Sequence, residues 1–165
     1  MSSAGNYLAF KRSRFSTRLP IDRVYTQAHY WLREATPGVW RVGFTKFATR
    51  MLGDIVEYQF DVAAGDAIEV GQKIGSIEGF KAVSEIYAVT EGGFAGVNAA
   101  LRDDITLIET DPYERGWLYE VRGEPESGNV DANGYAAILD ATIEKMLASR
   151  HELSQTEDAG NEVDT

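Results

Sequence analysis

The sequence contains no cysteine, and this absence removes several classes of chemistry together. Disulfides, thiolate metal sites and a cysteine nucleophile are all excluded. Long hydrophobic runs are also missing: no stretch of about 18 apolar residues occurs, so no membrane span is predicted. The first residues, MSSAGNYLAFKRSRF, lack the hydrophobic segment of a secretory signal, which indicates a cytoplasmic protein. If the chain takes part in sulfur or redox chemistry, an attached group must supply the sulfur.

Acidic residues outnumber basic ones, 26 to 16, but the start of the chain is locally basic. The formal net charge is −10, which argues against a nucleic-acid partner and favours basic docking partners. The cations near the N-terminus are Lys11, Arg12, Arg14, Arg18 and Arg23. We expect a basic arm without regular structure (1–22), a globular domain (23–149) and an acidic, disordered tail (150–165). Such an arm can stay solvated, fold back on the acidic body, or bind an acidic partner.

Alternation of apolar and polar residues predicts a mainly β fold with one C-terminal helix. The segment 45–52 reads as a short helix that Thr45 caps and Gly53 ends. Residues 135–148 have the spacing of a longer amphipathic helix. The glycine-rich segment 90–104 reads as turn and loop. Strands are predicted at 24–33, 38–44, 54–60, 73–79, 83–89, 105–110 and 117–123.

One lysine stands in the middle of a strand-like run, GSIEGFKAVSEIYA (75–88). A weak echo between 63–78 and 91–109 suggests two similar β halves joined by a hairpin with Lys81 at its tip. Small or apolar neighbours leave the amine uncrowded, while Glu78 and Glu85 lie three residues before it and four after it. An enzyme that modifies a single lysine needs such an exposed and marked amine. An ordinary solvated turn lysine is the plainer alternative.

Several separated motifs resemble the lipoyl-carrier H proteins of the glycine cleavage system and their relatives, across residues 24–146. The resemblance implies a lipoyl-domain barrel-sandwich hybrid of the H-protein type, with lipoate in amide linkage to Lys81 on a β-hairpin tip. Glu78, Glu85 and Gly65 match positions that lipoate ligases and other lipoyl-attaching enzymes read. Biotin carriers share the architecture but place methionines beside their lysine, unlike the FKA sequence here. The motifs are HYWLR (29–33), RVGFTKFATRMLGDIV (41–56), AGDAIEVGQKIGSIEGFKAVSEIYA (64–88), GGFAGVNAAL (92–101) and DPYERGW (111–117).

The sequence departs from that family where the lipoyl arm is expected to dock. Typical members have a Ser-His-Glu-Trp run, whereas this chain has Ala28, His29, Tyr30 and Trp31. A Ser-Val pair that usually precedes the lysine is replaced by Gly79 and Phe80. The residues of the predicted arm-docking cleft are Ala28, His29, Tyr30 and Phe80. Two polar partners of a cationic aminomethyl group are thus missing, and each charge-assisted hydrogen bond is worth roughly 1.5–3 kcal/mol.

The apolar replacements favour a sulfur cargo. They resemble the H-like lipoate-binding proteins of sulfur oxidation, whose arm would carry sulfur intermediates or electrons for a heterodisulfide-reductase-like complex. The alternative is a glycine-cleavage carrier of the aminomethyl group. Its partners would be glycine decarboxylase, aminomethyltransferase and dihydrolipoyl dehydrogenase. A non-lipoylated interaction protein is a third hypothesis.

No catalytic constellation appears in the sequence. There is no Ser/His/Asp set and no glycine-rich phosphate loop, so the chain is predicted to be a carrier and not an enzyme. His29 is expected to be a hydrogen-bonded structural histidine, not a metal ligand. His151, the other histidine, lies in the predicted acidic tail.

Overall fold

The computed structural model describes residues 6–163, with side chains described as far as residue 153. The helices are α1 (Lys46–Leu52), α2 (Ala100–Asp103), α3 (Leu107–Thr110) and α4 (Ala132–Val163). The strands are β1 (Tyr7–Arg12), β2 (Phe15–Pro20), β3 (Val24–Tyr25), β4 (Tyr30–Thr36), β5 (Val39–Phe44), β6 (Ile55–Phe60), β7 (Ala67–Ile68), β8 (Lys73–Gly79), β9 (Val83–Tyr87), β10 (Thr90–Val97) and β11 (Tyr119–Pro125). The prediction of a mainly β fold with a C-terminal helix is confirmed.

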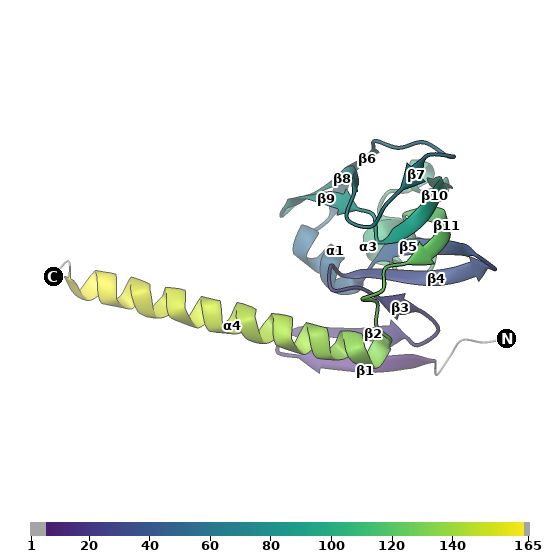
Figure 1. Ribbon diagram of the computed structural model, residues 1–165. Helices are drawn as coiled ribbons and strands as arrows, with labels where there is room; N and C mark the ends of the chain where they lie inside the picture. Colours follow the sequence, from purple (N-terminus) through teal and green to yellow (C-terminus); the bar gives the residue numbers. More distant parts are fainter. Residues whose placement is uncertain (1–5, 164–165) are drawn as a thin grey trace.

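The strands form three antiparallel sheets (Figure 1). The largest has the order β3-β4-β5-β11-β10-β7, and a second sheet has the order β6-β8-β9. The main core combines buried side chains of these two sheets, among them Leu32, Ile77 and Tyr119. The third sheet is the hairpin β1-β2, which lies along the first half of α4, while the rest of α4 projects away from the body.

The N-terminal segment differs from the expected irregular arm, because Tyr7–Pro20 forms the β1-β2 hairpin. The cluster of cations favoured an irregular arm, although apolar and polar side chains alternate along this segment as in a strand. Arg12 forms ion pairs with Asp140 and Glu144 of α4, so the arm does fold back on the acidic body. Residues 1–5 lie outside the described part of the chain. The hairpin and α4 share a second hydrophobic cluster that includes Phe15, Leu19, Tyr25, Trp31, Phe47, Tyr135, Leu139 and Ile143.

Two further expectations were wrong in secondary structure. Residues 90–97 form strand β10 and not a loop, because glycines let it cross β11 closely: a Cβ on Gly92 would lie 1.9 Å from the Arg122 carbonyl oxygen. A strand was expected at 105–110, but helix α3 forms there instead. Just before this helix, the Asp104 carboxylate accepts hydrogen bonds from the backbone N–H and the hydroxyl of Thr106. The second half of the internal echo therefore ends in a helix. The segment expected as a disordered tail continues α4 to Val163.

Helix α1 has the predicted boundaries. The Thr45 hydroxyl accepts a hydrogen bond from the Ala48 backbone N–H, and the Gly53 N–H closes the last turn on the Thr49 carbonyl. Gly53 has a positive φ of 77°, a conformation that favours glycine. The end of α1 is thus fixed where it meets the β8-β9 hairpin.

Candidate functional site: a lysine hairpin beside a cleft

Phe80 and Lys81 are the two central residues of the turn that joins β8 to β9, which is where the sequence predicts Lys81. Glu78 pairs with Val83, and the Gly79 N–H donates to the Ala82 carbonyl across the turn at 2.8 Å. The turn is tied to the end of α1 by two more backbone bonds. Lys81 N–H donates to the Leu52 carbonyl at 2.9 Å, and Phe80 N–H donates to the Asp54 carbonyl at 2.8 Å. The backbone of this hairpin tip is therefore clamped, while the Lys81 side chain is exposed.

Glycine makes this clamp possible. A Cβ on Gly53 would lie 2.9 Å from Lys81 Cγ, and one on Gly79 would lie 2.1 Å from the Leu52 carbonyl oxygen. Both contacts are too short for a methyl group, so the α1 end and the hairpin tip can touch only without these side chains. The close approach of the Leu52 carbonyl therefore explains why this chain has Gly79 where the family usually has a serine.

The three residues predicted to guide lipoate attachment do not lie together. Glu78 and Glu85 lie on one face of the β8-β9 hairpin, because their cross-strand partners Val83 and Ser76 alternate with buried Ile77. Gly65 lies outside the hairpin, in the β6-β7 connection. Its N–H donates to the Phe94 carbonyl of β10. Of the three residues, only the two glutamates lie on the hairpin that carries Lys81.

A cleft of about 380 Å³ opens beside the hairpin, and we call it the arm cleft. Ala28, His29 and Tyr30 of the predicted set line it, together with Ala82, the residue after Lys81. Phe80 does not. Its ring is 85% exposed and lines a neighbouring hollow, the lysine pocket, with Lys81. The remaining lining residues of the arm cleft are Phe44, Phe47, Ala48, Met51, Leu52, Ser84, Glu85 and Tyr87.

The arm cleft contains a carboxylate that sequence reasoning did not assign to it. The Tyr87 hydroxyl donates to Glu85, and Lys73 Nζ lies 3.5 Å from Glu85 Oε1. The Tyr87 hydrogen bond, and then Lys73, hold the pKa of Glu85 below its usual range, so it stays ionised at neutral pH. The position of Glu85, four residues after Lys81 on an edge strand, was the available signal.

Tyr30 is a core residue as well as a cleft residue. It is only 3% exposed, its ring stacks on Phe44 at 5.0 Å, and its hydroxyl accepts the Tyr87 backbone N–H at 3.2 Å. Burial raises its pKa to about 12. Tyr30 therefore holds β9 against β4 and leaves a neutral hydroxyl near the cleft, where the typical family member has a glutamate.

His29 has the structural role expected from the sequence. Its ring packs 4.7 Å from Phe47, and Nδ1 lies 2.8 Å from the Tyr135 hydroxyl of α4. Burial lowers its pKa from 6.5 to about 4, so the imidazole is neutral at pH 7. The neutral ring can accept a hydrogen bond from the Tyr135 hydroxyl at Nδ1, which links the arm cleft to α4.

This shifted pKa predicts a loss of stability in acid. Between pH 6.5 and about 4 the unfolded chain binds a proton at His29 that the folded chain does not, so stability falls as pH falls through this window. The expected loss is about 2 kcal/mol at pH 5 relative to pH 8. Urea unfolding of the protein and of His29→Asn at both pH values would measure it. Asparagine tolerates the positive φ of 71° at this position.

The matched variant decides whether His29 is the cause. Glu85, whose pKa lies below its usual value, also loses its stabilising interactions in acid, so some loss is expected in both proteins. A pH dependence that is equally steep in His29→Asn would contradict the assignment.

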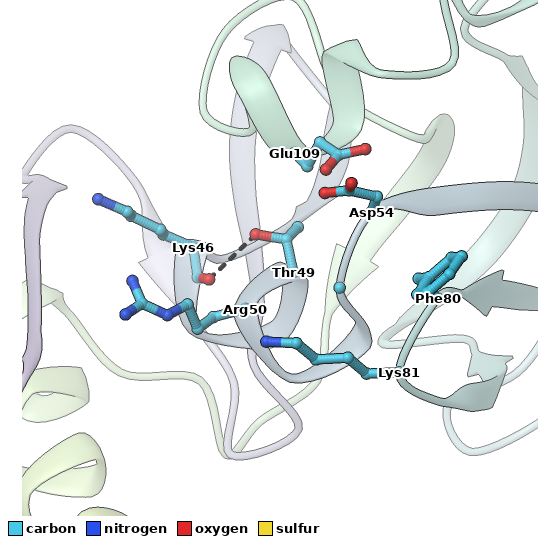
Figure 2. Close-up of a pocket in the computed structure, with 8 residues that line it drawn as sticks. Lys46, Thr49, Arg50, Asp54, Phe80, Lys81 and Glu109 are labelled. Carbon is cyan, nitrogen blue, oxygen red and sulfur yellow. Dashed lines mark hydrogen bonds between the residues drawn. The ribbon is translucent and has the colours of Figure 1, made fainter.

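The lysine pocket lies on the other side of the hairpin tip, with a volume of about 300 Å³ (Figure 2). Lys46, Arg50 and Lys81 line it opposite Asp54 and Glu109. Glu109 accepts the Ile55 N–H at 2.8 Å, and burial followed by the neighbouring Asp54 raises its pKa. Glu109 is therefore anchored in the fold by the Ile55 N–H, and its acidic neighbour is Asp54.

Two kinds of site are missing from the described part of the chain. Among residues 6–153, whose side chains are described, no group of His, Asp and Glu is arranged to hold a metal ion. None of the helices described there is long and apolar enough to cross a membrane.

Comparison with known proteins agrees with the geometry. The family model for the glycine cleavage H-protein matches residues 23–141. The glycine cleavage system H protein of Corynebacterium jeikeium is 39% identical over 124 residues, which cover 73% of this chain and 97% of the relative. The corresponding protein of an Enterobacter species is 36% identical, over 75% of this chain and 98% of the relative.

A solved structure shows the same fold. The crystal structure of a glycine cleavage system H protein from Mycobacterium marinum matches with a TM-score of 0.65 and 37% identity, covering 72% of this chain and 97% of that one. This likeness confirms the predicted barrel-sandwich fold of the H-protein type. The chain belongs to the glycine cleavage H-protein family.

Proposed function

We propose that this chain is the lipoyl carrier of a glycine cleavage system, with lipoate attached to Lys81. Proteins of the H-protein family carry lipoate and act as carriers, not as catalysts. The family implies glycine decarboxylase and aminomethyltransferase as partners. The observation that carries the proposal is an exposed lysine on a clamped hairpin, next to a cleft that contains an ionised carboxylate.

The residues present fit a lipoyl group on two counts. The Lys81 amine is exposed on a backbone held at both turn residues, and the cleft that starts at Ala82 has apolar walls for a hydrocarbon chain. Lipoate supplies a dithiolane that accepts the aminomethyl group and passes electrons on. Phe44, Phe47 and Met51 would shield the arm from water, and Glu85 would hold a cationic end group by a charge-assisted hydrogen bond.

Glu85 would therefore supply part of the hydrogen bonding to the cationic aminomethyl group that Ala28 and Tyr30 do not provide. We expect Glu85→Gln to lower the rate of aminomethyl transfer from glycine about tenfold, because a hydrogen bond to a charged group is worth about 1.5–3 kcal/mol. Both proteins would first be lipoylated to the same extent, confirmed by intact mass. Loading would then be measured with glycine and an active glycine decarboxylase.

Glu57→Gln is the matched control, since this exposed glutamate lies on β6, away from the arm cleft. It should load like the unchanged protein. If the unchanged lipoylated protein accepts no aminomethyl group beside an H protein that loads well, the proposal is wrong. If it loads but Glu85→Gln loads equally, the role of Glu85 is wrong.

A second candidate is a sulfur carrier for a heterodisulfide-reductase-like complex. The observation that favours it is the apolar character of the arm cleft at Ala28 and Tyr30, where typical members have polar side chains. The ionised Glu85 in the same cleft and the names of the reported relatives favour the first candidate. Failure to load with glycine would direct attention to this second function.

Recognition by a lipoyl-attaching enzyme stays a prediction for Glu78, Glu85 and Gly65. The two glutamates are exposed on the hairpin face next to the lysine, where an enzyme can reach them. Gly65 would need an enzyme that also contacts the β6-β7 connection.

A further inference from the structure

A second groove borders Lys81, and it is built largely from parts of the chain outside the family match at 23–141. It lies between the β1-β2 turn, α1 and α4, and its volume is about 310 Å³. We call it the arginine groove. Its lining residues are Arg12, Ser13, Arg14, Phe15, Phe47, Arg50, Met51, Lys81, Ile143, Met146, Leu147 and Arg150.

The groove concentrates positive charge in an acidic protein. Arg12 is neutralised by Asp140 and Glu144, which fasten the hairpin to α4. In the part of the chain with described side chains, residues 6–153, no salt bridge forms at Arg14, Arg50 or Arg150. With a formal net charge of −10, the chain has ample acids to pair them. Three free guanidiniums around one hollow form a site for an anion.

The floor of the groove is apolar. Phe15 and Phe47 pack edge to face at 5.5 Å, and Met51, Met146 and Leu147 remain 45%, 38% and 38% exposed. A phosphate or another small inorganic anion would gain nothing from this apolar floor, because it has no hydrocarbon part to bury there. The combination of apolar floor and cationic rim fits an amphipathic ligand, with a hydrocarbon chain and an anionic end.

Such a ligand has a natural point of attachment, because Lys81 itself lines the groove. Acylation of Lys81 removes its own charge and leaves the three arginines to bind the free end of the arm. We propose that the arginine groove is a second docking site for the acyl arm on Lys81 and selects arms that end in an anion. The arm cleft, with Glu85, takes cationic or neutral ends. This inference rests on the proposed acylation of Lys81.

The two hollows would sort the arm by its end-group charge. They share Phe47 and Met51, so an arm fixed at Lys81 needs only to turn across α1 to move from one to the other. Opposite charges on the two sides give each end group an attractive site and a repulsive one. In such a carrier the arm would lie in the arm cleft when the cargo is a cation and in the arginine groove when the cargo is an anion.

The chain offers two built-in tools for the test. It has no cysteine, so Lys81→Cys provides one thiol to which tethers can be attached without any lipoylating enzyme. It has only three methionines, Met1, Met51 and Met146. Met51 lines both hollows and Met146 lines only the arginine groove. Methyl NMR of ¹³C-methionine therefore reports which hollow is occupied.

We would compare alkyl tethers as long as a lipoyl-lysine arm, ending in a carboxylate, a methyl group or an ammonium. The carboxylate tether is expected to shift both Met146 and Met51, and the ammonium tether Met51 alone. The double variant Arg50→Gln with Arg150→Gln should at least halve the Met146 shift. Raising the salt concentration should have the same effect, because salt screens the attraction between exposed charges. Arg102→Gln, an exposed arginine of α2, should leave it unchanged.

Each other outcome would overturn the proposal. Equal Met146 shifts with the methyl tether would show an apolar groove without charge selection, and no Met146 shift with the carboxylate would show that the arm does not dock there. A glutamate-rich peptide that shifts Met146 and displaces the carboxylate tether would make the groove a protein-docking surface. Because the tethers are attached chemically, these results are independent of whether lipoate reaches Lys81 or glycine loads it.

Discussion

Lys81→Arg is expected to abolish lipoate attachment completely while leaving the stability of the protein unchanged. A guanidinium stays protonated and cannot serve as the acyl acceptor that an amine provides. The fold does not depend on the amine, because the turn is held by the backbone N–H groups of Phe80 and Lys81. Intact mass after incubation with lipoate and a lipoate ligase, with urea unfolding alongside, would measure both effects.

Lys73→Arg and Lys46→Arg are the matched controls. Lys73 lies on β8 of the same hairpin, and Lys46 lines the lysine pocket next to Lys81. Both variants should accept lipoate as the unchanged protein does. Lipoate on the Lys81→Arg protein, located by peptide mapping to another lysine, would contradict the assignment of the attachment site.

The features that were predictable from sequence depend on local chemistry. The α1 helix needs only the Thr45 cap and the Gly53 stop, and both lie within one short segment. The hairpin tip likewise follows from alternation on both sides of Lys81. These signals act over a few residues, so reading the chain in order finds them.

What was missed depends on contacts between distant segments. The basic arm folds as a hairpin because Phe15 and Leu19 are buried against α4, more than a hundred residues later. Strand β10 exists because its glycines meet the backbone of β11, and a glycine-rich sequence alone reads as loop. Glu85 was assigned to enzyme recognition alone, since only the folded cleft shows that it also faces the arm.

Tyr135→Ala is expected to destabilise the protein by about 3–5 kcal/mol, the usual cost of removing a buried aromatic ring. Tyr135 is fully buried on α4 and stacks on Tyr25 at a centroid distance of 4.8 Å. Its hydroxyl lies 2.7 Å from Thr45 Oγ1 and 2.8 Å from His29 Nδ1. One side chain thus joins α4 to the cap of α1 and to the wall of the arm cleft. Urea unfolding at pH 7 would measure the loss.

Tyr135→Phe separates the ring from the hydroxyl. It keeps the stacking on Tyr25 but leaves Thr45 and His29 without their shared partner, at a cost of about 1–3 kcal/mol. Because His29 lines the arm cleft, the phenylalanine variant should also loosen the cleft, seen as a changed Met51 methyl signal with Met146 unaffected. A Tyr135→Ala protein as stable as the original would mean that α4 is not part of the cooperative fold. The helix would then be an appendage, and the cleft would be held by the β-sheets alone.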